Sequence, residues 1–403
     1  MKVTLDNIRE RESRHVLQTY RRQPVAFIRG SGAYLYDVDG RKYLDCVSGI
    51  GVTSLGHAHP GLTAVIADQA ATLLHTSNLY YHPFQAEAAV RLAELSGLPR
   101  AFFCNSGTEA VEACLKFARR YWHTQGVTDR TGFVAVMGAF SGRTLGALSV
   151  THDEHYREPF GPLIGPVTFV DPLKPEALAE AVTAKTAAII AEPILGEGGI
   201  RPMTPAFAAA INEVCARTGT LFIADEVQTG LGRTGYPFYS RALGLDPDLM
   251  SVGKALGGGV PVGAALVSER VSRMVSPGDH GSTYGGNLLG TRAAAFVLDQ
   301  LMNGLIDHVK VVGAHLERRL RALALQHQAI VEVRGAGLMR GLEVSTDAMA
   351  IVNDARDRGL LVNRTDEVVV RLLPPLTIDT GEIDRAIEVL DGVFSTASQR
   401  ARI

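Results

Sequence analysis

The 403-residue sequence has few cysteines, little net charge and no long apolar run. Its cysteines form no CxxC pair and lie in apolar or helical stretches, so we expect free, buried thiols in a reducing compartment; they are Cys46, Cys104, Cys114 and Cys215. A formal net charge of −2 argues against a nucleic-acid-binding or anionic-membrane surface. No apolar run reaches about 18 residues, so no membrane span is expected. The charged start MKVTLDNIRERESRH lacks a signal core, which predicts a cytoplasmic protein.

Glycine, in contrast, is abundant, and its 42 residues cluster in a way that suggests tight turns around a small ligand. Apolar runs of strand length alternate with stretches of helical spacing. The expected strands lie at 101–106, 131–138, 187–194 and 220–227, and the expected helices between them at 107–122 and 204–219. This order predicts an α/β fold with a mostly parallel sheet flanked by helices. Ligands of such sheets lie beyond the carboxyl ends of the strands.

We expect the chain to divide into three parts. Residues 1–50 form an N-terminal segment that packs with a small domain, and they include a β-hairpin over 32–46 with an Asp-Gly turn. Residues 51–290 form the large ligand-binding domain. A long helical stretch then runs to about residue 327, and mixed strands and helices follow it. Residues 291–403 are therefore predicted to form a smaller α+β domain.

Two familiar nucleotide motifs fail on their spacing. Gly230-x-Gly232-x-x-Gly235 matches the dinucleotide fingerprint, but residues 226–229 separate it from the preceding strand, so a nicotinamide dehydrogenase is disfavoured. Lys254 is followed by alanine where a P-loop needs Ser or Thr. The histidine pairs lack HExxH spacing, so we expect no metal site; they are His57 with His59 and His152 with His155.

Lys254 is unusual because it lies in SVGKALGGGVP, among small and apolar residues with no carboxylate nearby. Asp225 ends the apolar run LFIAD, where a buried carboxylate is costly unless a cation or donors meet it. Taken alone, Asp225 fits a structural role, as a helix cap or in an ion pair, as well as it fits a functional one. Together, a lysine and a strand-end acid match the needs of pyridoxal phosphate, which takes a lysine for covalent attachment and an acid against its pyridine nitrogen.

A phosphate site is expected at NSGTEA, residues 105–110, which joins a strand to a helix. Backbone N–H groups, two hydroxyls and the helix N-terminus at this turn favour a dianion. Ser106 and Glu109 also have the spacing of a capping box, and both interpretations can hold together.

Seven motifs occur in order along nearly the whole chain: NSGTEA, FSGRT, EPILGEGG, DEVQTGLGRTG, SVGKALGGGVP, GSTYGGN and VRLLPPL. With them the sequence resembles the class III, fold-type I pyridoxal-phosphate aminotransferases, and it is most similar to their acetylornithine and ornithine branch. The resemblance implies a homodimer with shared active sites.

The resemblance also implies roles for single residues. Lys254 would hold the cofactor covalently, and Asp225 would face its pyridine nitrogen. The other implied cofactor contacts are Gln228 near the ring hydroxyl, Val227 and Phe140 on the two ring faces, Ser106, Gly107 and Thr108 at the phosphate, and Thr283 at the phosphate held by the neighbouring subunit. Ser282 is expected to contact substrate, and Glu192 to be a supporting or structural acid.

Two arginines are expected to grip substrate carboxylates. Arg371 lies inside the apolar run VVVRLLPPL, where an arginine is costly unless it meets a carboxylate. The resemblance implies that Glu197 covers Arg371 in one half-reaction and swings away when 2-oxoglutarate binds. Arg143 would then bind the distal carboxylate of 2-oxoglutarate, or the α-carboxylate of an ω-amino donor.

The amine donor is expected to have a blocked α-nitrogen. Enzymes acting on free ornithine carry a tyrosine where this chain has Ile50, and an apolar residue cannot pair with an ammonium. This favours N²-acetylornithine and arginine biosynthesis. Ser141 in FSGRT departs from the usual histidine, and similar serine variants act on lysine bound to an amino-group carrier protein. Carrier-bound lysine and succinylated ω-amino donors therefore remain open.

Overall fold

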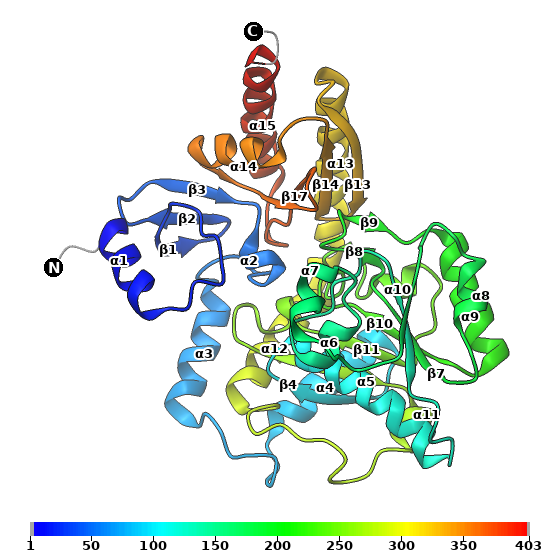
Figure 1. The fold of residues 1–403 in the computed structure, drawn as a ribbon. Helices are drawn as coiled ribbons and strands as arrows, with labels where there is room; N and C mark the ends of the chain where they lie inside the picture. Colours follow the sequence, from blue (N-terminus) through cyan, green and yellow to red (C-terminus); the bar gives the residue numbers. More distant parts are fainter. Residues whose placement is uncertain (1–3, 401–403) are drawn as a thin grey trace.

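A computed structural model describes residues 4–400, with side chains described for 4–397. Its centre is a seven-stranded sheet in the order β4-β12-β11-β10-β7-β5-β6 (Figure 1). The bounds in that order are Arg100–Cys104, Gly263–Val267, Leu249–Val252, Leu221–Asp225, Thr186–Ala191, Gly132–Val136 and Val167–Val170. Strand β12 is antiparallel to both neighbours, and the pairs from β11 to β6 are parallel. The predicted mostly parallel sheet is confirmed.

The sheet is buried on both faces. Along β10, Leu221 and Ile223 belong to one apolar core, whereas Phe222 and Ala224 belong to the other. This alternation follows from the two-residue period of a strand. Helix α5 covers the first face and α9 the second. The helices of this part are α3 Pro60–Thr72, α4 Pro83–Ser96, α5 Gly107–Thr124, α6 Leu145–Ser149, α7 Glu154–Arg157, α8 Ala177–Ala181, α9 Pro205–Thr218, α10 Tyr239–Ala242, α11 Glu269–Ser272 and α12 Leu288–Gln300.

Three smaller sheets accompany the central one, two of four strands (Figure 1) and one of two strands, β8 Ile194–Leu195 and β9 Arg201–Pro202. One four-stranded sheet has the antiparallel order β13-β14-β17-β16, with bounds Ile330–Ala336, Met339–Val344, Val369–Leu372 and Asn363–Thr365, and it is accompanied by α13 Ile306–Gln326, α14 Ala348–Asp357 and α15 Thr380–Arg400. The other four-stranded sheet joins β1 Phe27–Ser31, β2 Tyr34–Asp37 and β3 Lys42–Asp45 to the late strand β15 Leu360–Leu361. The predicted hairpin is confirmed as β2 and β3.

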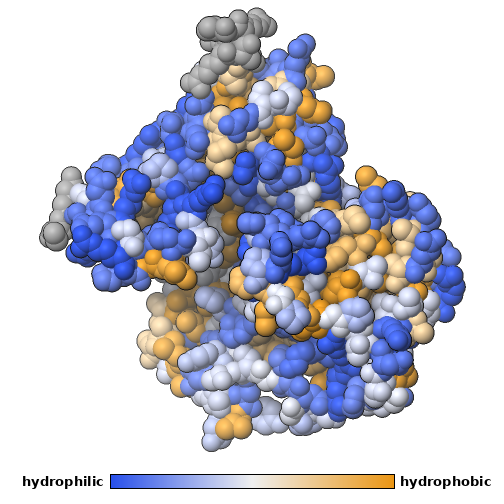
Figure 2. Space-filling model, in the orientation of Figure 1, coloured by the Kyte–Doolittle hydropathy of each residue, from blue (hydrophilic) through white to orange (hydrophobic). Residues whose placement is uncertain are grey.

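The N-terminal segment also contains α1 Leu5–His15 and the short α2 Ser48–Gly51. The β3–β15 pairing ties this segment to the C-terminal part of the chain. The predicted boundaries at 50 and 290 remain predictions, and three residues at each end of the chain lie outside the described range. Hydrophilic side chains cover most of the face in Figure 2, with apolar ones gathered in separate patches.

The structure corrects some local expectations. The helical stretch 290–327 is not continuous, because a π-turn at Leu301–Leu305 with Gly304 at φ 106° separates α12 from α13. Strand β12, sequence GAALV, was not anticipated among so many small residues. Cys215 is only partly buried, although all four cysteines are free as expected. Within the described range, no helix is both long and apolar enough to span a membrane.

Candidate active site

Asp225 and Lys254 meet because their strands are neighbours. Parallel β10 and β11 end at the same edge of the sheet, with Asp225 at the end of β10 and Lys254 just beyond β11, in the 3₁₀ turn η2 Lys254–Gly257. Ser251 donates a hydrogen bond of 2.9 Å to Asp225 Oδ1, and the Val227 N–H donates one of 3.3 Å. The predicted strand that carries Asp225 is confirmed, whereas β11, which precedes Lys254, was not predicted from the sequence.

The surroundings of Asp225 fit a cationic partner. The residue is 3% exposed, and its Oδ2 atom accepts no hydrogen bond within the described residues. Burial raises the pKa of this carboxyl, while hydrogen bonds from Ser141 and Ser251 oppose the rise. A buried carboxylate oxygen without a donor is costly. A cationic N–H group placed against this oxygen would supply both the donor and the charge that it lacks.

Lys254 is held in an uncommon backbone conformation, with φ at 41°. Such conformations cost energy and cluster at functional sites. Burial lowers the pKa of the Lys254 ammonium, and the charge of Glu197 partly offsets this effect. A lysine with a lowered pKa is more often neutral, as a nucleophilic or basic amine must be.

The N-terminus of α5 lies against the same pair. A Cβ atom on Gly107 would come within 2.6 Å of Val227 Cγ1, and one on Gly253 would come within 2.8 Å of the Gly107 Cα. Glycine at 107 and 253 therefore allows the helix start, Val227 and the lysine turn to pack together. Ser106 caps the helix by accepting the Glu109 N–H at 3.3 Å. Glu109 reaches back to the N–H of Asn105, one residue earlier than in a standard capping box.

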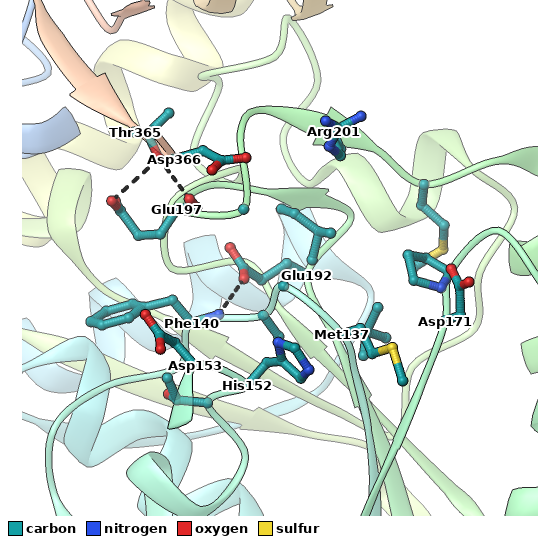
Figure 3. A pocket seen from close by; sticks show the side chains of 18 of the residues that line it. Met137, Phe140, His152, Asp153, Asp171, Glu192, Glu197, Arg201, Thr365 and Asp366 are labelled. Carbon is teal, nitrogen blue, oxygen red and sulfur yellow. Dashed lines mark hydrogen bonds between the residues drawn. The ribbon is translucent and has the colours of Figure 1, made fainter. Parts of the chain in front are cut away.

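Glu192 joins two loops at this edge of the sheet. Its Oε1 atom accepts the Phe140 N–H at 2.9 Å, and its Oε2 atom accepts the Gly196 N–H at 3.0 Å. Burial, reinforced by the charge of Asp225, raises the pKa of Glu192 to about 8. Glu192 thus supports the loop that carries Phe140, in line with the expectation of a supporting acid (Figure 3).

Arg371 is 1% exposed and fully engaged by its surroundings. Its Nη1 atom lies 2.5 Å from Glu197 Oε1 and 3.1 Å from Gln228 Oε1. Its Nε atom donates to Asn363 Oδ1 at 3.2 Å. Burial alone would raise the pKa of Glu197, but the charge and hydrogen bond of Arg371 outweigh it and lower that pKa. The predicted Glu197–Arg371 pair is therefore present.

Arg143 has a different setting. It is exposed, and its guanidinium carbon lies 3.6 Å from the ring centroid of Tyr156 and 5.5 Å from that of Phe140. Stacking on aromatic faces leaves the edge N–H groups of an arginine free for a carboxylate. Tyr156, which lies on the four-residue helix α7, was not anticipated from the sequence.

A cavity of about 950 Å³ lies next to part of this site. Phe140, Tyr156, Glu192, Glu197 and Thr365 line it, and Figure 3 shows several of them. Lys254, Asp225, Arg143 and Arg371 are not among the residues that line it. Thr365, at the end of β16, was not anticipated from the sequence.

Three predicted site residues lie further out. Ser282 accepts a hydrogen bond of 3.2 Å from Asn105 Nδ2, which brings it to the start of α5. Thr283 and Ile50 are exposed. Ile50 belongs to a turn in which Ser48, Gly49 and Ile50 all have positive φ, and this turn contacts the lysine turn η2.

Comparison with known proteins agrees with this geometry. Residues 17–394 match the family model described as Aminotransferase class-III, and the chain belongs to this family, whose members use pyridoxal phosphate.

Within the family, the chain is 45% identical to an acetylornithine aminotransferase of Archaeoglobus fulgidus over 94% of this chain and 98% of that protein. It is 44% identical to one of Methanocaldococcus jannaschii, over 95% and 97%. The structure is similar to an ornithine aminotransferase of Toxoplasma gondii, with a TM-score of 0.94, 31% identity and coverage of 99% and 96%. It is also similar to an acetylornithine aminotransferase of Elizabethkingia anophelis, with a TM-score of 0.87, 29% identity and coverage of 97% and 99%.

Proposed function

We propose that this aminotransferase moves the terminal amino group of N²-acetylornithine to 2-oxoglutarate, giving N-acetylglutamate 5-semialdehyde and glutamate. The observation that carries the proposal is the pair of unlike arginines: Arg371 covered by Glu197, and Arg143 open on Tyr156. Two carboxylate anchors, one of which is covered, suit two substrates of different shape. The names of the relatives support the same activity.

The cofactor would be held at the edge of the sheet where Asp225 and Lys254 meet. Lys254 would attach it, and Asp225 would keep its pyridine nitrogen protonated. Ser106, Gly107 and Thr108 would bind its phosphate at the start of α5, where N–H groups and the helix dipole favour an anion. When bound, pyridoxal phosphate accepts the electrons released as a carbon–hydrogen bond of the amine breaks. Phe140 and Val227 would enclose its ring.

Lys254 would move the proton. Once released from the cofactor, its amine is buried, and burial lowers its pKa, which favours the neutral form that a base must have. The substrate would be oriented by its carboxylate on Arg143, and for 2-oxoglutarate also on Arg371. Gln228 would adjust with this exchange, because it already accepts a hydrogen bond from Arg371.

Ile50 and Ser141 bear on the donor. Ile50 offers no polar group for a free α-ammonium, which supports a donor with an acylated α-nitrogen. The Ser141 hydroxyl faces Asp225, so the serine in FSGRT is accommodated at the cofactor acid. Neither residue separates N²-acetylornithine from succinylated donors or from carrier-bound lysine, which remain the alternatives.

We also infer a homodimer. Exposed apolar side chains gather between α3 and α4, where Leu74, Leu79, Tyr80 and Tyr81 are 50%, 84%, 69% and 106% exposed. Tyr284, 64% exposed, directly follows Thr283, and its ring lies 5.5 Å from that of His75 at a tilt of 44°. A second subunit covering this surface would bring Thr283 to a neighbouring active site. A cytoplasmic location stays a prediction.

The proposal is tested in half-reactions. The purified enzyme is loaded with pyridoxal phosphate and given N²-acetylornithine with no keto acid present. We expect the absorbance band of the lysine-bound cofactor to disappear and to return when 2-oxoglutarate is added. Free ornithine should react far more slowly, and Lys254→Ala should show no such cycle. A normal cofactor band that responds to N-succinylornithine or carrier-bound lysine but not to N²-acetylornithine would reject the proposed donor.

A further inference from the structure

We propose that Thr365 is a positioning residue that latches Glu197 over Arg371 and so sets how the enzyme divides its affinity between ω-amino donors and glutamate or 2-oxoglutarate. The inference rests on the proposed two-substrate function and adds to it a residue from the C-terminal part of the chain.

The hydroxyl of Thr365 points at the Glu197 segment (Figure 3). Its Oγ1 atom lies 2.8 Å from the Glu197 carbonyl oxygen, 3.0 Å from the Gly196 carbonyl oxygen and 3.4 Å from Glu197 Oε2. A threonine hydroxyl has one hydrogen to donate, so these are alternative acceptors of a single bond. Thr365 is 3% exposed, which keeps water from taking its place.

Thr365 and Arg371 lie on adjacent strands and contact the same two residues, Gly196 and Glu197. Thr365 lies at the end of β16 and Arg371 on β17, and the two strands pair antiparallel. Arg371 Nη1 contacts the Gly196 carbonyl at 3.3 Å and Glu197 Oε1 at 2.5 Å. The covered state of Arg371 therefore uses an ion pair from one strand and a hydroxyl from the next.

The Glu197 side chain has room to leave. It keeps 36% of its surface exposed and lines the large cavity. Glu192 anchors the Gly196 N–H, so the segment is fixed on one side of Glu197. Gly198 follows on the other side, then Gly199 with φ at 89°. Breaking the Thr365 contact removes a restraint on Glu197 and leaves the anchor at Gly196 in place.

Removing the hydroxyl should therefore favour glutamate over the ω-amino donor. Thr365→Val keeps the shape of the side chain and deletes the hydrogen-bond donor. Glutamate must displace Glu197 to reach Arg371, so its dissociation constant should fall about fivefold, the size of one hydrogen bond. The ω-amino donor binds with Arg371 covered, which is the state of the structure, so its dissociation constant should change little. Thr365→Ser keeps the hydroxyl and should match the wild type.

The experiment is a stopped-flow titration of the pyridoxal-phosphate form with glutamate and, separately, with N²-acetylornithine. Both amines react with the same starting form of the enzyme. The ratio of the glutamate to the N²-acetylornithine dissociation constant therefore measures how strongly Thr365 holds Glu197 over Arg371. We expect this ratio to fall about fivefold in Thr365→Val, and to stay within twofold in Thr365→Ser. Equal weakening for both amines, or no change for either, overturns the proposal.

The glutamate arm keeps this test separate from the choice of donor. If the wild type reacts with glutamate but not with N²-acetylornithine, the proposed donor is wrong, and tighter glutamate binding by Thr365→Val still supports the latch. Unchanged glutamate binding in that variant refutes the latch whatever the donor. Thr365→Ala, which places no methyl group against Gly196, provides the same test if the valine variant fails to fold.

Discussion

Arg371 and Arg143 carry the same charge but differ in how their guanidinium groups are buried and paired. Arg371 is buried and already engaged by Glu197, Gln228 and Asn363. Arg143 is exposed and lies on Tyr156, with no hydrogen bond or ion pair recorded for it in the described part of the chain. A buried guanidinium without a counter-charge is strongly destabilising, whereas an exposed one is solvated by water. The buried anchor therefore needs a resident carboxylate, and only that anchor can act as a gate.

The largest expected effect comes from replacing Lys254, which should abolish turnover regardless of which arginine binds the substrate. Lys254→Ala should lower turnover at least about 10⁴-fold with every amine, because covalent attachment and proton transfer both depend on this amine. The fold should persist, since no hydrogen bond or ion pair of the Lys254 side chain is recorded in the described range. Turnover and circular dichroism check this, with the surface variant Lys174→Ala as the control. Substantial residual turnover would mean that another group carries the proton.

The next largest effect should distinguish the role of Arg371 from that of Arg143. Arg371→Gln should lower kcat/KM for 2-oxoglutarate roughly 100-fold, because a charged, desolvated contact to the α-carboxylate contributes about 3 kcal/mol. The donor half-reaction should change much less, since it runs with Arg371 covered. Steady-state kinetics with each substrate varied in turn provides the measurement. Equal losses for both substrates would show that Arg371 has no selective role.

Replacing Arg143 should have a smaller effect, and it should affect both substrates alike. Arg143→Gln should raise KM for both the donor and 2-oxoglutarate, by roughly 30-fold, because both place a carboxylate there. The wild-type KM should rise with ionic strength more steeply than that of the variant, as exposed charges are screened by salt. Kinetics at two salt concentrations checks this. A loss confined to one substrate would place the other substrate elsewhere.

Much of the cofactor end of the site was predictable, and the reason is local sequence. Asp225 ends a buried strand that was predicted, and Lys254 was singled out by its glycine-rich surroundings. Strand β11, which brings Lys254 to the same edge of the sheet, was not predicted. Tyr156 and Thr365 could not be predicted in this way. Each acts through a contact with a distant segment, Arg143 and Glu197 respectively, and each lies on an element of three or four residues with no periodic pattern. Strand β12 was missed for a related reason, because small residues give a weak strand signal.

Tyr156 offers a way to weaken the exposed anchor without removing it. Tyr156→Leu should raise KM for both substrates about fivefold, because a cation–π contact contributes about 1 kcal/mol and its loss frees the arginine to take other rotamers. Tyr156→Phe keeps the ring face and should stay within twofold of the wild type. The values of kcat should change little in either variant. A large loss in the phenylalanine variant would instead assign a role to the tyrosine hydroxyl.

The smallest expected effect concerns pH: the contribution of Glu197 to 2-oxoglutarate binding at Arg371 should not change with pH near neutrality. Because the pKa of Glu197 lies below its ordinary value near 4.5, the stabilisation from its pair with Arg371 is fully present above that value and is lost as pH falls through the folded-state pKa. Between about pH 6 and about pH 7 Glu197 keeps its charge, and this window lies below the pKa of about 8 of the neighbouring Glu192. The dissociation constants of 2-oxoglutarate for wild type and Glu197→Gln, measured with the aminated enzyme, should therefore keep a constant ratio over this range. A ratio that changes toward pH 6 would show that Glu197 already gains a proton there, in which case protonation as well as substrate would open the gate.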